Sequence, residues 1–151
     1  MEDQIVRLIS RLVAPFIQLY GIYIILHGHL SPGGGFSGGA IFGASLVLLA
    51  LSFNLAAGVK QISHATASYL ESGGALGFAL TGLAALALGG YYLANGSAGF
   101  PLGRPGELFS SGAILLITVF IGIKVASTMV TLFYNLIEGE ARDGVSEKPE
   151  Q

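Results

Sequence analysis

Lys124 is the residue whose type and setting most clearly suggest chemistry, because it lies near the middle of a long apolar run. Insertion scales assign a central lysine in a membrane helix about +2.5 to +3.5 kcal/mol, and such residues usually face a bundle interior or water and mark an ion path. At the helical period its face also carries four polar side chains, Ser127, Thr128, Thr131 and Asn135. The pattern predicts an ion path or charge relay that includes Lys124, Thr128 and Thr131, or an ion pair with a carboxylate of another chain that only locks assembly.

Glu71 is the second residue that could act on a cation. It is the acidic residue at the inner boundary of the third apolar run, just before that run begins. Two interpretations stay open for it. A carboxylate in the first turn of a helix is stabilised by the helix dipole and needs no further role, or the carboxylate attracts cations at the mouth of a path.

The segment HGHLSPGGGFSGG, residues 27–39, combines two histidines, a proline and several glycines between two apolar runs. Its glycines fit the dinucleotide pattern G-x-G-x-x-G, but a membrane helix precedes them instead of a short strand, and no acid follows that could hold a ribose. His27 and His29 point to different helix faces and have no third ligand nearby, which argues against a metal site. The histidines could exchange protons near neutral pH or simply cap a helix end. The segment therefore predicts a tight turn between two membrane helices.

The elements that position these residues follow from composition. Of the 151 residues, 52% are hydrophobic and only 11% are charged, whereas an ordinary soluble domain has about a quarter charged residues. Four apolar runs are each long enough to cross a membrane, which takes roughly 20 residues. They cover residues 7–29, 37–58, 74–94 and 109–137. We predict an all-α integral membrane protein of four transmembrane helices in two tandem hairpins, followed by a charged tail at 138–151.

The basic residues predict the orientation. Four spans put both termini on one side, and the loops and ends of that side hold Arg7, Arg11, Lys60, Arg142 and Lys148. The opposite loops hold only Arg104. By the positive-inside rule both termini are expected to be cytoplasmic. The first run ends in HGH instead of a small-residue cleavage site, so we expect it to remain as a span.

Charge and cysteine content exclude several classes of function. The net charge of −2 offers no basic surface for nucleic acid. The absence of cysteine excludes cysteine-ligated iron–sulfur clusters and thiol catalysis from this chain. We therefore expect no cofactor here, and any redox chemistry belongs to a partner.

Glycines recur at the spacing that lets helices pack closely. Gly35, Gly39 and Gly43 form a ridge along the second run, and Gly73 and Gly77 repeat the spacing on the third. Small residues four apart allow two membrane helices to approach closely. We therefore predict that these glycines lie in helix contacts.

One longer repeat is visible. PGGGFSGGAI at 32–41 and PGELFSSGAI at 105–114 agree at seven of ten positions, and each leads into an inward-running helix. Two hairpins of the same topology would form a parallel repeat about an axis along the membrane normal. In a chain rich in glycine and alanine the match could also arise by chance.

In its motif and its predicted topology, the chain resembles the B-subunit family of Mrp (also called Mnh) multisubunit cation/proton antiporters. The residues that carry the resemblance lie at 19–51, around the core HGH-x-x-PGGGF-x-GG. The family loop maps onto His27, His29, Pro32, Gly33, Gly34, Gly35 and Phe36. The similarity extends over about residues 5–137. The second half, which includes Lys124 in GIKVA, is more similar to homologues inside membrane-bound hydrogenase and sulfur-reducing complexes.

The resemblance implies a small, non-catalytic, multi-pass subunit in the cytoplasmic membrane, within a complex that exchanges Na⁺ for H⁺. Its partners would be other large and small Mrp-type subunits, membrane lipid, and redox subunits that hold any iron–sulfur or nickel–iron centres. The subunit would help form or scaffold the cation path. The alternatives are a free-standing Mrp antiporter, or a purely structural subunit that touches no ion. An independent enzyme is disfavoured because the sequence offers no nucleophile, acid pair or metal set.

Overall fold

The computed structural model describes residues 2–30, 33–53, 64–104, 106–107 and 109–146. These residues form four long helices, α1 (Glu2–Leu26), α2 (Gly34–Ser52), α4 (His64–Ala87) and α5 (Ala113–Ser146), and one short 3₁₀ helix, η1 (Gly96–Ala98). Each long helix contains a stretch long and apolar enough to cross a membrane. The described part of the chain contains no strand. The predicted all-helical membrane fold with four spans is confirmed, and the orientation of the termini stays a prediction.

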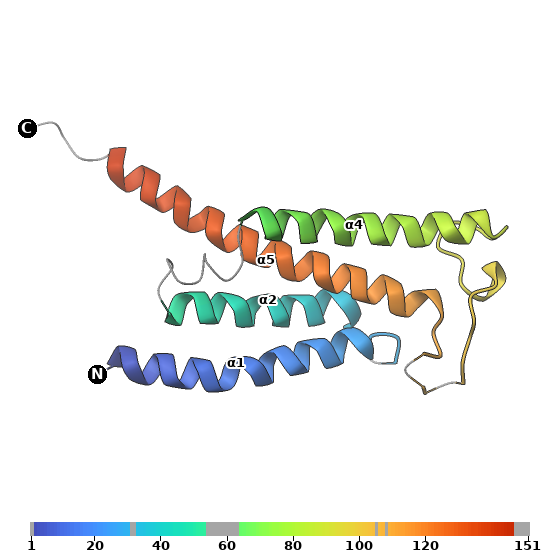
Figure 1. Ribbon diagram of the computed structural model, residues 1–151, viewed down its shortest axis with the longest axis horizontal. Helices are drawn as coiled ribbons and strands as arrows, with labels where there is room; N and C mark the ends of the chain where they lie inside the picture. The colour runs from blue at the N-terminus through green and yellow to red at the C-terminus, as the bar shows by residue number, and fades with distance from the viewer. Residues whose placement is uncertain (1, 31–32, 54–63, 105, 108, 147–151) are drawn as a thin grey trace, which may run out of the picture.

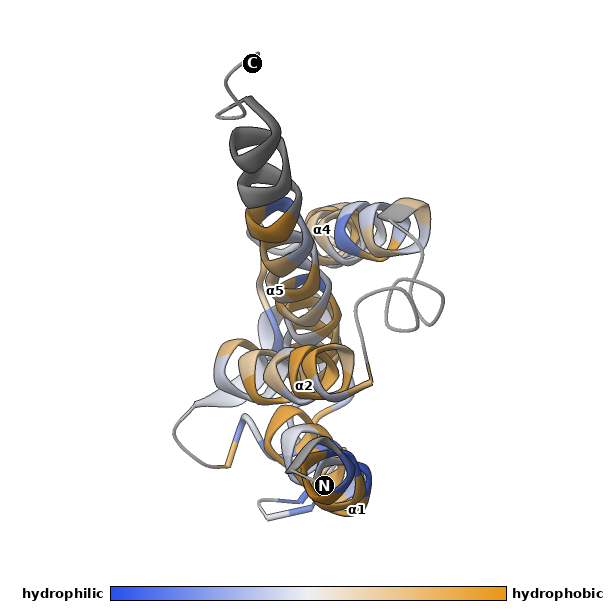
Figure 2. Ribbon diagram, turned by 90° about the vertical axis from the view of Figure 1, so that its left-hand side faces the viewer, coloured by the Kyte–Doolittle hydropathy of each residue, from blue (hydrophilic) through white to orange (hydrophobic). Residues whose placement is uncertain are grey.

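The four helices lie in a single layer in the order α1, α2, α5, α4 (Figure 2). Each hairpin packs its own two helices together, α1 against α2 and α4 against α5, and the hairpins meet where α2 packs against α5 (Figure 1). Because the helices form a single layer, none of them packs over either face of it. Large apolar side chains accordingly stay exposed on the outer helices, among them Leu8, Phe16, Leu76 and Leu80. Such surfaces are those that lipid or other membrane helices cover.

The helix bounds differ from the predicted spans, most of all in the second hairpin. The helix α4 begins at His64, ten residues before the predicted start at 74, because small and polar residues in HATASYLESGG continue the helix although they lower its hydropathy. The helix α2 begins at Gly34, inside the stretch that the sequence assigned to the turn. The last part of the second predicted span, 54–58, lies outside the described residues.

Glycine makes the contact between α2 and α5 a close one. A Cβ atom placed on Gly39 would lie 2.6 Å from the carbonyl oxygen of Gly122, and one on Gly43 would lie 2.8 Å from the Cβ of Met129. A Cβ on Gly35 would collide with the carbonyl oxygen of Thr118. The ridge of Gly35, Gly39 and Gly43 thus faces α5 directly, and no larger residue fits there without moving backbone.

The glycine contact between α4 and α5 differs from the one expected at Gly73 and Gly77. A Cβ on Gly77 would collide with the ring of Phe120, whereas one on Gly73 would meet nothing within 4 Å. The neighbouring Gly74 makes the close contact instead, because a Cβ there would lie 2.8 Å from the Cβ of Lys124. The assignment of Gly73 to a helix contact is therefore wrong within this chain. The two glycines of α4 that contact α5 are therefore three residues apart instead of four, and a spacing does not by itself fix which face of a helix meets its neighbour.

Candidate functional site

The site is an ion pair between the two helices of the second hairpin. Lys124 Nζ lies 3.5 Å from Glu71 Oε1. Lys124 lies near the middle of the span Ala113–Ile137, and Glu71 lies about two turns inside the span Ala65–Ala87. Both charges are therefore within the membrane-spanning part of the chain. A salt bridge in such surroundings satisfies two groups that would each be costly alone.

The ion pair corrects two expectations from the sequence. Glu71 was expected at the boundary of a span, but it lies inside one because α4 starts at His64. For Lys124, one of the two interpretations expected a carboxylate from another chain, and the structure supplies a carboxylate from this chain. In the sequence, Glu71 and Gly74 are three residues apart and so lie on neighbouring parts of one helix face, but this spacing does not say that the face meets Lys124.

Thr128 completes the site from the same helix as Lys124. Its Oγ1 lies 2.9 Å from Glu71 Oε1 and 2.8 Å from the carbonyl oxygen of Lys124. A carboxylate and a carbonyl offer only acceptors, so the single hydrogen of this hydroxyl has two acceptors within reach. The sequence placed Thr128 on the face of Lys124, and the structure adds that it contacts the carboxylate.

The hydroxyls of Ser127 and Thr131, which share the helix face of Lys124, contact backbone carbonyls of their own helix. The hydroxyl of Ser127 lies 3.0 Å from the carbonyl oxygen of Ile123, and that of Thr131 lies 3.0 Å from the carbonyl oxygen of Ser127. Hydroxyls in membrane helices often bond to the carbonyl one turn earlier. The structure therefore brings Glu71, Lys124 and Thr128 together and leaves Thr131 outside that contact.

The ion pair is partly open to its surroundings. The side chains of Lys124 and Glu71 are 41% and 32% exposed, because α4 and α5 cover only one side of each. None of the described helices lies over the pair on its open side, since the four helices form a single layer. A half-exposed charge pair at this depth calls for further polar groups or water from outside the layer.

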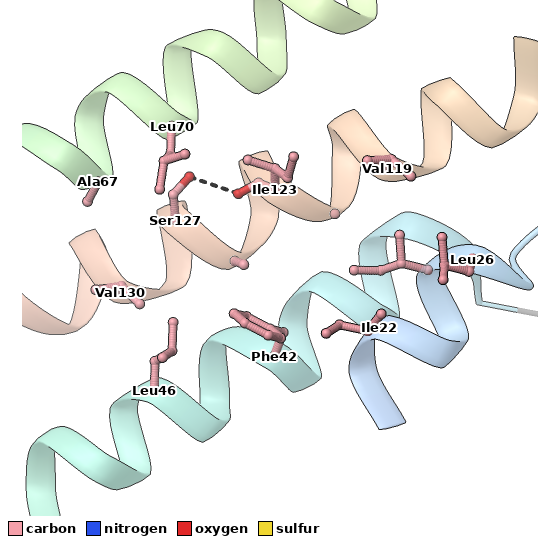
Figure 3. Close-up of a pocket in the computed structure, with 13 residues that line it drawn as sticks. Ile22, Leu26, Phe42, Leu46, Ala67, Leu70, Val119, Ile123, Ser127 and Val130 are labelled. Carbon is pink, nitrogen blue, oxygen red and sulfur yellow. Dashed lines mark hydrogen bonds between the residues drawn. The ribbon is translucent and has the colours of Figure 1, made fainter. Parts of the chain in front are cut away.

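The other face of the layer carries an apolar groove of about 350 Å³, formed by side chains of all four helices (Figure 3). Phe42 and Leu46 of α2 line one side and Leu70 of α4 the other. The hydroxyl of Ser127 is the polar group of this lining, and it already donates to Ile123 (Figure 3). No periodic pattern in the sequence predicts this groove, because its lining comes from four separate helices.

The groove and the ion pair lie on different sides of α5. Gly122 and Ala126 line the groove, and each is two residues from Lys124. Two residues correspond to about 160° around an α-helix. Ser127, which also lines the groove, lies nearer to Lys124 at the edge of the groove. The ion pair itself is not part of the groove's lining, and we call the side of the layer that carries it the polar face.

The turn between α1 and α2 contacts the second hairpin at the end of the layer away from the N-terminus (Figure 1). His29 Nε2 donates to the carbonyl oxygen of Glu107, at 3.3 Å, in the long loop between α4 and α5. His27 Nδ1 donates to the carbonyl oxygen of Tyr23, at 3.1 Å, and its ring stacks on that of Tyr23. Both histidines thus contact backbone carbonyls at this end of the layer.

The glycines of this turn have backbone angles that favour glycine. Gly33 has φ 127° and Gly34 has φ 61°, and such positive values strain other residues. Gly34 also lies against Thr118 of α5, whereas Phe36 is exposed. Pro32 lies outside the described residues. Within the described ranges, no three His, Cys, Asp or Glu side chains gather as a metal-ligand set.

Comparison with known proteins gives one family match. The family described as "domain related to MnhB subunit of Na+/H+ antiporter" matches residues 5–131. The chain is 35% identical over 94 residues to the B subunit of a Na⁺/H⁺ antiporter of Bacillus subtilis, and the match covers 62% of this chain and 65% of that protein. It is 36% identical over 121 residues to an uncharacterized protein of Methanocaldococcus jannaschii, covering 77% of this chain and 45% of that protein.

A solved structure is similar over most of the chain. It belongs to the membrane-bound sulfane sulfur reductase, an archaeal respiratory membrane complex. The match has a TM-score of 0.73 at 38% identity and covers 87% of this chain and 56% of that chain. The chain thus spans about half the length of the archaeal proteins it matches.

Proposed function

This chain belongs to the MnhB family of Na⁺/H⁺ antiporter subunits, and from that premise we propose that it is a small subunit of a sodium/proton antiporter module inside a membrane-bound respiratory complex. The respiratory setting is favoured over a free-standing antiporter by the likeness to the sulfane sulfur reductase complex. In this proposal the chain catalyses no reaction itself. It is a multi-pass protein of the cell membrane, with both termini on the cytoplasmic side.

The observation that carries the proposal is the half-exposed ion pair of Glu71 and Lys124 at membrane depth. Charges in a medium of low dielectric constant interact strongly over several ångströms. A cation that moves along the polar face would therefore change the balance between the two charges. We assign the pair the role of a charge relay beside the cation path, with Thr128 as the hydroxyl that contacts its carboxylate.

The two faces of the layer suggest where the partners lie. The polar face leaves part of both charges uncovered, so a large antiporter-like subunit or a water-filled path is expected there. The groove on the opposite face has no charged side chain in its lining and suits lipid tails. Iron–sulfur or nickel–iron centres, if the complex contains them, belong to its redox subunits.

A purely structural role is the second candidate, and the glycine contacts favour it. Gly39 and Gly43 bring α2 and α5 into close backbone contact. A closely packed layer of this kind could hold larger subunits in place without touching an ion. The two functions differ in what happens when the ion pair is neutralised.

The test uses the native assembly with Glu71→Gln and, separately, Lys124→Met, reconstituted into lipid vesicles. Both variants keep side-chain size and remove charge. The relay proposal expects an assembled complex whose sodium-dependent proton exchange falls at least tenfold. Leu132→Met, an exposed apolar position on α5, is the matched control and should exchange normally. Normal exchange by both charge variants would refute the relay, and loss of assembly in both would favour the structural role.

A further inference from the structure

The hydroxyl of Thr128 has two acceptors and one hydrogen. Its Oγ1 lies 2.9 Å from Glu71 Oε1 and 2.8 Å from the carbonyl oxygen of Lys124. A threonine hydroxyl donates a single hydrogen bond at a time. The two acceptors therefore compete for one hydrogen.

The charge of Glu71 decides which acceptor is favoured. When Glu71 is ionised, its oxygens only accept, and the Thr128 hydrogen favours Oε1 over the neutral carbonyl oxygen of Lys124, because a hydrogen bond to a charged acceptor is the stronger one. When Glu71 is protonated, its own O–H can donate to Thr128 Oγ1. The threonine hydrogen is then free to turn to the Lys124 carbonyl oxygen, 2.8 Å away.

From this geometry we propose that Glu71, Thr128 and the backbone carbonyl of Lys124 form a two-state proton-binding site within the membrane. The proposal rests on the proposed function, and it names the proton as the ligand of the relay. A hydronium ion in water on the polar face transfers its proton to Glu71 Oε1, so that one O–H bond of hydronium breaks, one O–H bond forms on the carboxyl group, and a water molecule is left. The new O–H group donates a hydrogen bond to Thr128 Oγ1, whose own hydrogen rotates from Glu71 to the carbonyl oxygen of Lys124.

Binding of the proton changes the charge of the site. With Glu71 ionised, the ion pair with Lys124 is neutral overall. With Glu71 protonated, the ammonium of Lys124 keeps its charge and loses its counter-ion. The site then carries a positive charge that repels a cation nearby. Proton uptake and cation departure would thus be linked, as exchange of one for the other requires.

The surroundings of Glu71 are simple enough for this assignment. α4 packs against α5, and Lys124 is the charged side chain that α5 brings to Glu71. On α4 itself, the neighbours of Glu71 within one turn are uncharged. Both Glu71 and Lys124 are partly exposed on the polar face, which leaves a way for a proton to reach the carboxylate.

Thr128 acts here as a positioning residue. Its test therefore needs a measured quantity that would stay the same if Thr128 only stabilised the fold. We suggest the pH profile of sodium-dependent exchange by the native assembly in vesicles, for the unchanged chain, Thr128→Val and Thr128→Ser. Valine has the shape of threonine but no hydroxyl to donate, which disfavours the ionised form of Glu71. The midpoint of the profile should move up by about one pH unit. Serine keeps the hydroxyl and should restore the midpoint.

An unchanged midpoint in Thr128→Val would overturn the inference. If that variant fails to assemble, Thr128→Ala removes the same hydroxyl with less bulk and carries the same expectation. A second measurement is the infrared band of a protonated carboxylic acid, which should vanish in Glu71→Gln and persist to higher pH in Thr128→Val. Glu71→Gln also separates the two proposals. Normal exchange there refutes the relay itself, whereas lost exchange there with no shift in Thr128→Val refutes only the proton switch.

Discussion

The two hairpins share a topology but differ in what lies between their helices. In the first, Gly21 and Gly38 bring α1 and α2 into contact, and a Cβ on Gly38 would lie 2.7 Å from the carbonyl oxygen of Gly21. The polar contact there is a neutral one, in which the buried Ser52 hydroxyl lies 2.7 Å from that of Ser10. The first hairpin is therefore built for close and uncharged packing.

In the second hairpin the close contact lies beside charge. Gly74 packs against the backbone and Cβ of Lys124, whose ammonium reaches Glu71 on the same side. The glycine lets the lysine backbone approach α4, and the side chain then extends along that helix to the carboxylate. The comparison indicates that close packing in the first hairpin serves the layer alone, whereas in the second it also positions a pair of charges.

The largest effect is expected from Gly38→Leu in the first hairpin. The new side chain would meet the backbone of α1, which cannot move away as a flexible side chain can. Overpacking of this kind typically costs about 1 to 3 kcal/mol and occasionally more. The amount of assembled complex in detergent extracts should fall severely. Gly73→Leu is the matched control, because nothing lies within 4 Å of a Cβ there, and equal losses in both would show that glycine packing is not what the first hairpin depends on.

An intermediate effect is expected from breaking the charge pair of the second hairpin. Lys124→Met leaves the carboxylate of Glu71 without its counter-charge, which should lower the stability of the assembly by about 2 kcal/mol, less than for a fully buried pair because both groups are partly exposed. The double variant with Glu71→Gln should recover most of the lost thermal stability while exchange stays low. A double variant no more stable than Lys124→Met would contradict the pairing.

The smallest effect is expected from Ser52→Ala, which removes the neutral polar contact of the first hairpin. The hydroxyl of Ser10 loses one neighbour, and a hydrogen bond between uncharged groups contributes about 1 kcal/mol. Thermal melting of the assembly should shift slightly, and sodium-dependent exchange should stay at its normal rate. A marked loss of exchange would mean that the first hairpin also takes part in transport.

The two copies of the repeated motif sharpen the same contrast. In the first copy, at 32–41, the helix begins at its third residue, Gly34. In the second copy, at 105–114, the helix begins only at its ninth residue, Ala113. There Asn95 of the long loop caps the helix, since its Oδ1 accepts a hydrogen bond of 3.0 Å from the N–H of Ala113. The two segments are identical at seven of ten positions, yet their helices start at different residues. Local sequence does not fix the start of a helix when a distant side chain caps it.

Composition and periodicity alone determined that this chain forms four membrane helices in two hairpins, because hydropathy over roughly 20 residues reports directly on burial in lipid. They also identified Lys124 and Thr128 as residues on one helix face. The single-layer order and the groove were decided only by tertiary structure. So was the pairing of Lys124 with Glu71, because a period states which residues share a face but not which other helix that face meets. The two charges are far apart in the sequence, and only the close approach of α4 and α5 at Gly74 brings them together.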